Sequence, residues 1–198
     1  MDKLRKQISF IVEIDKLKNV YRQSYLADKS RHENDAEHSW HLAIMAFLLA
    51  EHVDEKVDIL KVMKMVLMHD LVEIDAGDTY CYDEKAKQDK REREEKCAKR
   101  LFEMLPEEQC REMYELWEEF EQMETPEAKY AAALDRLQPV LLNYTSEGKS
   151  WKEHGIRIDQ VLGRNGRIQN SSKKIWGFVE DLLHDAVEKG YLKDSQKS

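Results

Sequence analysis

Apolar residues recur at helical spacing along most of the chain, and this pattern predicts a series of amphipathic helices. The first covers residues 2–17, where one apolar face is expected to pack on the rest of the protein. A second, strongly apolar helix begins at Asn34 or Asp35, because either side chain can cap free backbone amides. Residues 19–34 break the periodicity and indicate an irregular connection, and a third helix is predicted over 58–68.

Helix start signals also recur in the second half of the chain. Residues 83–100 carry Glu and Lys at helical spacing and predict a solvated helix that docks only through its far end. At Thr125 a capping hydroxyl is followed by proline in the first turn, which begins a helix rich in Ala and Leu. Further helices are predicted to begin at Pro106, at a capping box over Ser150–Glu153 and at Asn170 or Ser171.

Composition strengthens the helical prediction. The 198 residues include only 7 glycines and 3 prolines, whereas good helix formers are abundant. A chain of this length most simply forms one domain. We therefore expect a single-domain, all-α protein over residues 1–198.

The net charge and the lack of long apolar runs argue against a nucleic-acid-binding protein and a membrane protein. A formal net charge of −8 argues against a surface that neutralises a nucleic-acid backbone. No apolar run has the length of a signal peptide core or a membrane span, so we expect a cytoplasmic protein without a membrane partner. The three cysteines follow no CxxC spacing and are expected to be free thiols in a reducing compartment: Cys81, Cys97 and Cys110.

The stretch 66–78, VLMHDLVEIDAGD, holds the strongest candidate chemistry. An apolar helical run leads directly into His69 and Asp70, and Glu73 follows within one helical turn, so all three side chains can face one pocket. Gly77 is expected to end this helix. A lone His-Asp pair is more often a cap or a surface pair, but polar groups in such apolar surroundings favour a bound cation.

Two further positions place polar side chains in apolar helices. His38 and His41 lie one turn apart near the start of the second helix, where an isolated histidine is most often a core residue with satisfied hydrogen bonds. Asp135 lies in the middle of an apolar helix and needs a partner. Its neighbour Arg136 points about 100° away around the helix, so the partner must come from another element.

Together His38, His69, Asp70 and Asp135 form a set of candidate metal ligands on different predicted helices. Two imidazoles and two carboxylates suit a divalent ion such as Mn, Co, Fe, Ni or Mg and leave positions open for water and substrate. The absence of cysteine ligands argues against structural zinc.

The order H…HD…D, with RHENDAEHS before the first histidine and HDLVEIDAGD around the second, resembles the HD-domain phosphohydrolases, most closely their small 5'-deoxynucleotidase branch. The resemblance covers about 17–142 and implies a helical bundle with the metal between helices, on which the C-terminal helices over 150–190 pack. It assigns the four candidate ligands to the metal. It also implies that Glu73 and Asp78 line the site, assist the water or the substrate, or hold a second metal.

The same resemblance implies a reaction. A metal-bound water, oriented by Glu73 or Asp78, attacks the phosphorus of a (deoxy)nucleoside 5'-monophosphate, with Asp70 at the metal. Arg22 falls near an arginine that contacts the phosphate in this branch, and Arg31 is a second candidate, although surface arginines are common.

Three alternatives stay open. Another nucleotide, such as a dNTP, a cyclic nucleotide or an alarmone, is a possible substrate, but enzymes that hold longer phosphate chains generally need extra basic segments, which this acidic chain does not show. A non-catalytic, metal-stabilised binding module is a second alternative, and a bundle without metal is the third. We also expect a homodimer, because Trp117, Phe120 and Trp176 exceed what one small core requires.

Overall fold

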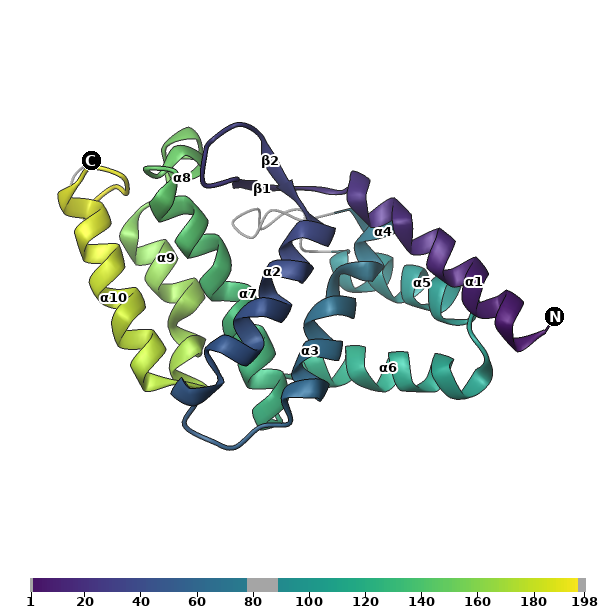
Figure 1. Cartoon of the computed structure of the whole chain (residues 1–198). Coiled ribbons are helices and arrows are strands. Elements are labelled where there is room, and N and C mark those ends of the chain that lie inside the picture. Colours follow the sequence, from purple (N-terminus) through teal and green to yellow (C-terminus); the bar gives the residue numbers. More distant parts are fainter. Residues whose placement is uncertain (1, 78–88, 196–198) are drawn as a thin grey trace.

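The computed structural model describes residues 2–77 and 89–195, which are mostly helical, as the sequence predicts (Figure 1). None of the helices within these residues is long and apolar enough to cross a bilayer. The α-helices are α1 (Lys3–Glu13), α2 (Asp35–Leu48), α3 (Ile59–Met68), α4 (Glu73–Ala76), α5 (Lys90–Phe102), α6 (Glu107–Gln122), α7 (Pro126–Thr145), α8 (Lys149–Glu153), α9 (Ile158–Asn165) and α10 (Lys173–Glu188). Short 3-10 helices are η1 (Ile14–Asn19), η2 (Ala50–His52), η3 (His69–Val72) and η4 (Gly166–Asn170).

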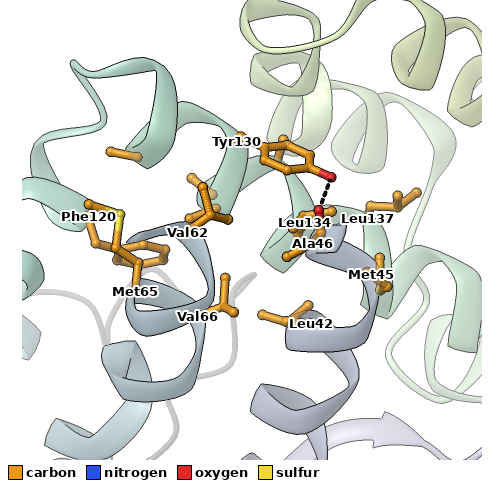
Figure 2. Packing of buried hydrophobic residues seen from close by; sticks show 14 of the residues in the cluster. Leu42, Met45, Ala46, Val62, Met65, Val66, Phe120, Tyr130, Leu134 and Leu137 are labelled. Carbon is orange, nitrogen blue, oxygen red and sulfur yellow. Dashed lines mark hydrogen bonds between the residues drawn. The ribbon is translucent and has the colours of Figure 1, made fainter. Parts of the chain in front are cut away.

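The core is built where α2, α3 and α7 pack together (Figure 2). Leu42 of α2, Val66 of α3 and Leu134 of α7 are all fully buried there. Tyr130 is also fully buried, and its hydroxyl donates a hydrogen bond of 3.0 Å to the carbonyl oxygen of Ala46. This bond satisfies the one polar atom of the ring and ties α7 to α2.

The prediction of an irregular connection over residues 19–34 is wrong in part. Two short antiparallel strands, β1 (Tyr21–Tyr25) and β2 (His32–Asn34), form a hairpin beside the helices (Figure 1). The strands have 5 and 3 residues, too few to produce a clear alternation of apolar and polar positions. The hairpin places Arg22 against α7 and the start of α2.

The predicted cap of the second helix is Asn34. Its side chain accepts a hydrogen bond of 2.9 Å from the backbone N–H of Glu37, and the Glu37 carboxylate accepts one of 3.2 Å from the backbone N–H of Asn34. This capping box fixes the first turn of α2, which carries Asp35 and leads directly to His38.

Two predicted helix starts are wrong. Ser150 is buried and caps nothing, because α8 begins at Lys149 and ends at Glu153. The chain then turns through Gly155, whose φ of +64° favours glycine, so α9 is a separate helix. The last helix is capped by Ser172, whose hydroxyl accepts from the backbone N–H of Ile175 at 3.0 Å.

Two other predicted helix starts are confirmed. The hydroxyl of Thr125 caps α7 by accepting a hydrogen bond of 3.2 Å from the backbone N–H of Ala128, as predicted. α7 then continues without interruption through Pro139. Pro106 directly precedes α6, also as predicted.

The charged segment predicted over residues 83–100 contributes α5. Its far end is buried through Cys97, Leu101 and Phe102, as predicted, but Glu94 is buried as well. Of the predicted free thiols, Cys97 and Cys110 are free, whereas Cys81 lies outside the described residues.

Of the three side chains proposed as a dimer surface, two are not available for one. Trp117 and Phe120 are buried within the chain, and Trp176 packs partly buried against the core. Phe10 is the one buried side chain of α1, so the apolar face predicted to pack is largely exposed. The homodimer therefore stays a prediction. Exposed large apolar side chains on α1, α2 and α3 are Leu4, Ile8, Ile11, Val12, Trp40, Phe47, Leu48, Leu60 and Leu67.

Candidate metal centre

Three separate elements bring the four predicted ligands together. His38 comes from α2, His69 and Asp70 from η3, and Asp135 from α7. The Nε2 atom of His38 lies 3.1 Å from Oδ1 of Asp135, and Nε2 of His69 lies 3.1 Å from Oδ1 of Asp70 and 3.7 Å from Oδ1 of Asp135. Ligand atoms of His38, His69 and Asp135 all lie within 4.8 Å of one another, as a shared cation requires.

The local backbone around His69 differs from the predicted continuous helix. α3 ends at Met68, the chain tightens into the 3-10 turn η3, and α4 starts at Glu73. His69, Asp70 and Glu73 nevertheless line one cavity, as predicted. Gly77 ends α4 with a φ of +77°, which agrees with the predicted stop.

Hydrogen bonds at the outer ring nitrogens orient both imidazoles. Nδ1 of His69 donates to the carbonyl oxygen of Val66 at 2.9 Å, and Nδ1 of His38 donates to Oε1 of Gln138 at 3.0 Å. The amide of Gln138 in turn donates to Glu33 at 2.6 Å. These bonds leave both Nε2 atoms directed at the carboxylates, which is the usual arrangement of metal-binding histidines.

A guanidinium lies among the same carboxylates. Nη1 of Arg22 lies 2.7 Å from Oδ2 of Asp70 and 3.1 Å from Oδ1 of Asp35, and Nη2 lies 3.9 Å from Oδ1 of Asp135. Asp35 is fully buried. The carboxylates therefore converge on a position that attracts positive charge.

The pKa shifts at the site also favour positive charge beside the carboxylates. Burial opposes protonation of His69, but Asp70 and Asp135 outweigh it and raise the pKa of His69 to about 10. Burial would raise the pKa of Asp70 and of Asp135, but the neighbouring histidines hold both pKa values below the ordinary range. The pKa of His38 is raised as well, because Asp135 and Glu33 outweigh its burial and the repulsion by Arg22.

The donor set fits a divalent metal. Two imidazole nitrogens and two carboxylates face one another, and the buried Nε2 atom of His69 has no hydrogen-bond partner among the described residues. A cation at this point would satisfy His38, His69 and Asp135 without protonating the imidazoles, and Asp70 lies beside it, 3.1 Å from His69. Nitrogen and oxygen donors of this kind suit Mn, Fe, Co, Ni or Mg.

A second group of buried acids adjoins the first. Carboxylate oxygens of Asp35, Asp70 and Glu73 lie within 4.8 Å of one another. The sequence suggested a second metal at Glu73 and Asp78, but Asp78 lies outside the described residues. Sequence reasoning treated Asp35 as a possible helix cap and missed its position at the site.

Three of the four metal-ligand candidates, His69, Asp70 and Asp135, line a cavity of about 220 Å³. Arg22 lines this cavity, as expected of a substrate contact. Arg31 does not line it. The guanidinium of Arg31 instead holds the carboxylate of Glu37 at the protein surface, with one N–O distance of 2.8 Å. Lining residues from the later helices are Lys90, Glu94, Phe120, Glu121, Met123, Arg136, Pro139, Val140, Asn143, Ser150, Trp151, Arg164 and Asn165.

Sequence reasoning missed several residues around the ligands. Gln138 follows Asp135 by three positions and so lies on the same face of the helix. This spacing could have indicated that Gln138 lies near the ligands. Glu33 precedes the capping box, and Glu94 belongs to a densely charged segment, so neither differed from a surface acid in sequence. Both are buried in the structure, at 2% and 4% exposure.

The raised pKa of His69 gives a pH dependence for the metal-free protein. Folded His69 keeps its proton up to about pH 10, whereas an unfolded histidine loses it near 6.5. This contribution to stability is complete below pH 6.5 and is lost as pH rises through about 10. In excess chelator, the urea concentration at the unfolding midpoint should therefore decrease as pH rises from 6.5 to about 10. The variant His69→Gln should show a smaller decrease over the same pH range. A midpoint that rises across the same range would contradict the assignment.

Known proteins resemble this chain in sequence and in fold. The human protein 5'-deoxynucleotidase HDDC2 is 31% identical over 138 residues, which are 69% of this chain and 66% of the human protein. The Danio rerio protein of the same name is 28% identical over 187 residues, 94% of this chain and 84% of its own length. A crystal structure of a predicted metal-dependent phosphohydrolase from Magnetospirillum magnetotacticum MS-1 has a TM-score of 0.92 and 53% identity, and covers 96% of this chain and 95% of its own.

The family described as HD domain matches residues 14–176, which include all four candidate ligands. The match also extends past the segment 17–142 that carried the resemblance in sequence. Fold, ligand arrangement and relatives agree, and the chain therefore belongs to the HD-domain family and is homologous to the 5'-deoxynucleotidases named HDDC2 at about 30% identity.

Proposed function

We propose that this protein is a metal-dependent phosphomonoesterase that hydrolyses (deoxy)nucleoside 5'-monophosphates to nucleoside and phosphate. The observation that carries the proposal is the convergence of His38, His69, Asp70 and Asp135, of which the last three line a cavity that Arg22 also lines. Relatives named 5'-deoxynucleotidase support the choice of substrate, although this chain spans only 66% of the human one.

The metal would be held by His38, His69, Asp70 and Asp135. When bound, a divalent ion lowers the pKa of a coordinated water and neutralises phosphoryl oxygens. Phosphate-monoester hydrolysis is among the slowest uncatalysed reactions, so this assistance is needed.

The protein's own side chains supply position and proton transfer. Glu73 is 4% exposed and lines the cavity beside Asp70. In the proposal its carboxylate would orient the attacking water and accept its proton. Asp78 is the alternative acid for this role and lies outside the described residues. The water oxygen bonds to phosphorus, the bond from phosphorus to the 5' oxygen breaks, and a proton passes to that oxygen.

Arg22 would hold the phosphoryl oxygens. Its guanidinium lies between Asp35 and Asp70 at the edge of the ligand group and on the cavity wall, where it is expected to contact a bound phosphate. Arg31 is engaged by Glu37 outside the cavity, so the proposal gives the phosphate contact to Arg22 alone.

A metal analysis followed by a nucleotide screen tests the proposal. The protein loaded with Mn, Co or Mg is expected to release phosphate from deoxynucleoside 5'-monophosphates in preference to dGTP and cyclic dinucleotides. Ribonucleotides in the same panel measure the sugar preference. If chelation unfolds the protein but no nucleotide releases phosphate, a non-catalytic metal-stabilised module is the better description.

A further inference from the structure

Two arginines on the wall of the cavity form no ion pair. Arg136 of α7 and Arg164 of α9 line the same cavity as Asp135 and His69. Neither guanidinium is paired with an acid in the part of the chain that the structure describes. In contrast, Arg22 in the same cavity contacts three carboxylates. The chain carries 40 acidic residues, so two unpaired arginines at a functional cavity need an explanation.

Arg136 is only partly satisfied by the protein. One terminal nitrogen donates to the backbone carbonyl of Ala132 at 2.9 Å, and the other lies 3.6 Å from the sulfur of Met123. Its Nε atom is buried and has no hydrogen-bond partner among the described residues. A sulfur and one backbone oxygen are weak compensation for a largely buried guanidinium.

Other arginines add to the positive charge at this wall. Arg164 and Arg167 repel the guanidinium of Arg136, and Asp135 attracts it. Glu121 also lines the cavity and attracts Arg136, but it forms no ion pair with it. An anionic group of a ligand would relieve the repulsion and supply the missing acceptors.

We propose that Arg136 and Arg164 form a subsite for a second phosphate group on the nucleotide whose first phosphate lies at the metal centre. The inference rests on the proposed function. Arginine suits this role because its planar donors match phosphate oxygens. The sequence shows no basic segment that could hold a second phosphate. The fold instead brings two arginines from different helices to one cavity.

The second phosphate has two possible sources, a 3'-phosphate on the sugar or the β-phosphate of a 5'-diphosphate. In either case one phosphate is hydrolysed, the one at the metal centre. There the oxygen of water bonds to phosphorus, the bond from phosphorus to the 5' oxygen breaks, and the 5' oxygen takes up the proton. The phosphate held by the arginines stays intact: a 3'-phosphate leaves on the nucleoside, and a β-phosphate leaves as part of pyrophosphate.

The test compares three nucleotides that share one base and sugar: dAMP, deoxyadenosine 3',5'-bisphosphate and dADP. With metal-loaded protein at fixed ionic strength, at least one two-phosphate nucleotide should have a kcat/KM about tenfold above that of dAMP, the effect of one or two charged hydrogen bonds. Arg164→Gln should remove most of this preference. Arg111→Gln, an exposed arginine on α6, is the matched control and should preserve it.

Calorimetric titration in excess chelator separates this proposal from the proposed function. Without turnover, the preferred two-phosphate nucleotide should still bind more tightly than dAMP, and Arg164→Gln should reduce the difference. Such binding with no hydrolysis of any nucleotide would support the subsite and refute the enzyme activity. Equal kcat/KM for all three nucleotides, or an unchanged ratio in Arg164→Gln, would overturn the subsite. Arg164 is exposed, so its variant decides the matter even if Arg136→Gln fails to fold.

Discussion

His69→Ala is expected to abolish metal binding and phosphatase activity together. The Nε2 atom of His69 lies 3.1 Å from Asp70 and 3.7 Å from Asp135, so its removal leaves a gap in the ligand group beside both carboxylates. A catalytic metal supplies several kcal/mol of transition-state stabilisation. With a tenfold change for every 1.36 kcal/mol, the rate should fall at least about a thousandfold. Metal content by mass spectrometry and phosphate release should be measured on the same preparation.

His184→Ala is the matched control for this experiment. His184 is exposed on α10, away from the residues that line the cavity, and its removal should change neither metal content nor rate. Circular dichroism on both variants checks that the helices are intact. A His69→Ala protein that keeps its metal and its activity would show that the reaction does not use this centre.

Glu73→Gln should lower kcat by about 10² to 10⁴, the range for loss of a general base. The amide keeps the size of the side chain but cannot take up a proton at neutral pH. Metal content should stay at the wild-type level, because the proposed ligand set does not include Glu73. Steady-state kinetics with dAMP, together with metal analysis, checks both expectations.

Glu103→Gln provides the same chemical change at an exposed position of the loop before α6, and its rate should match the wild type. Two other results would reassign Glu73. Loss of metal as well as activity would make it a ligand, consistent with its place beside Asp35 and Asp70. Full activity in Glu73→Gln would leave Asp78 as the acid that orients the water.

The four metal-ligand candidates could be predicted because polar side chains in apolar helices are costly without a partner. Asp135 is the clearest case, since a partner from another element was predicted for it, and His38 of α2 is that partner. Helix positions were also predictable where capping chemistry is explicit, as at Asn34 and Thr125. At Ser150 the same type of signal failed, because packing buries that serine and the backbone turns at Gly155.

The residues around the ligands could not be predicted in the same way. Asp35, Glu33 and Glu94 look like ordinary surface acids, and only the tertiary packing of their elements buries them. The arginines of the cavity wall, Arg136 and Arg164, are separated by a short helix and two turns, and no local pattern joins them. Their proximity depends on how α9 and α7 pack, which local sequence signals do not encode.

The contact between His38 and Asp135 joins positions 97 residues apart in the chain. Loop closure over such a distance is entropically costly and comes late unless other long-range contacts have already formed. Neither half of the chain can therefore assemble the ligand group alone, and a truncated protein should have no high-affinity metal. Bound metal would then stabilise the chain against global unfolding, so amide hydrogen exchange in α2 and α7 should slow together on metal addition.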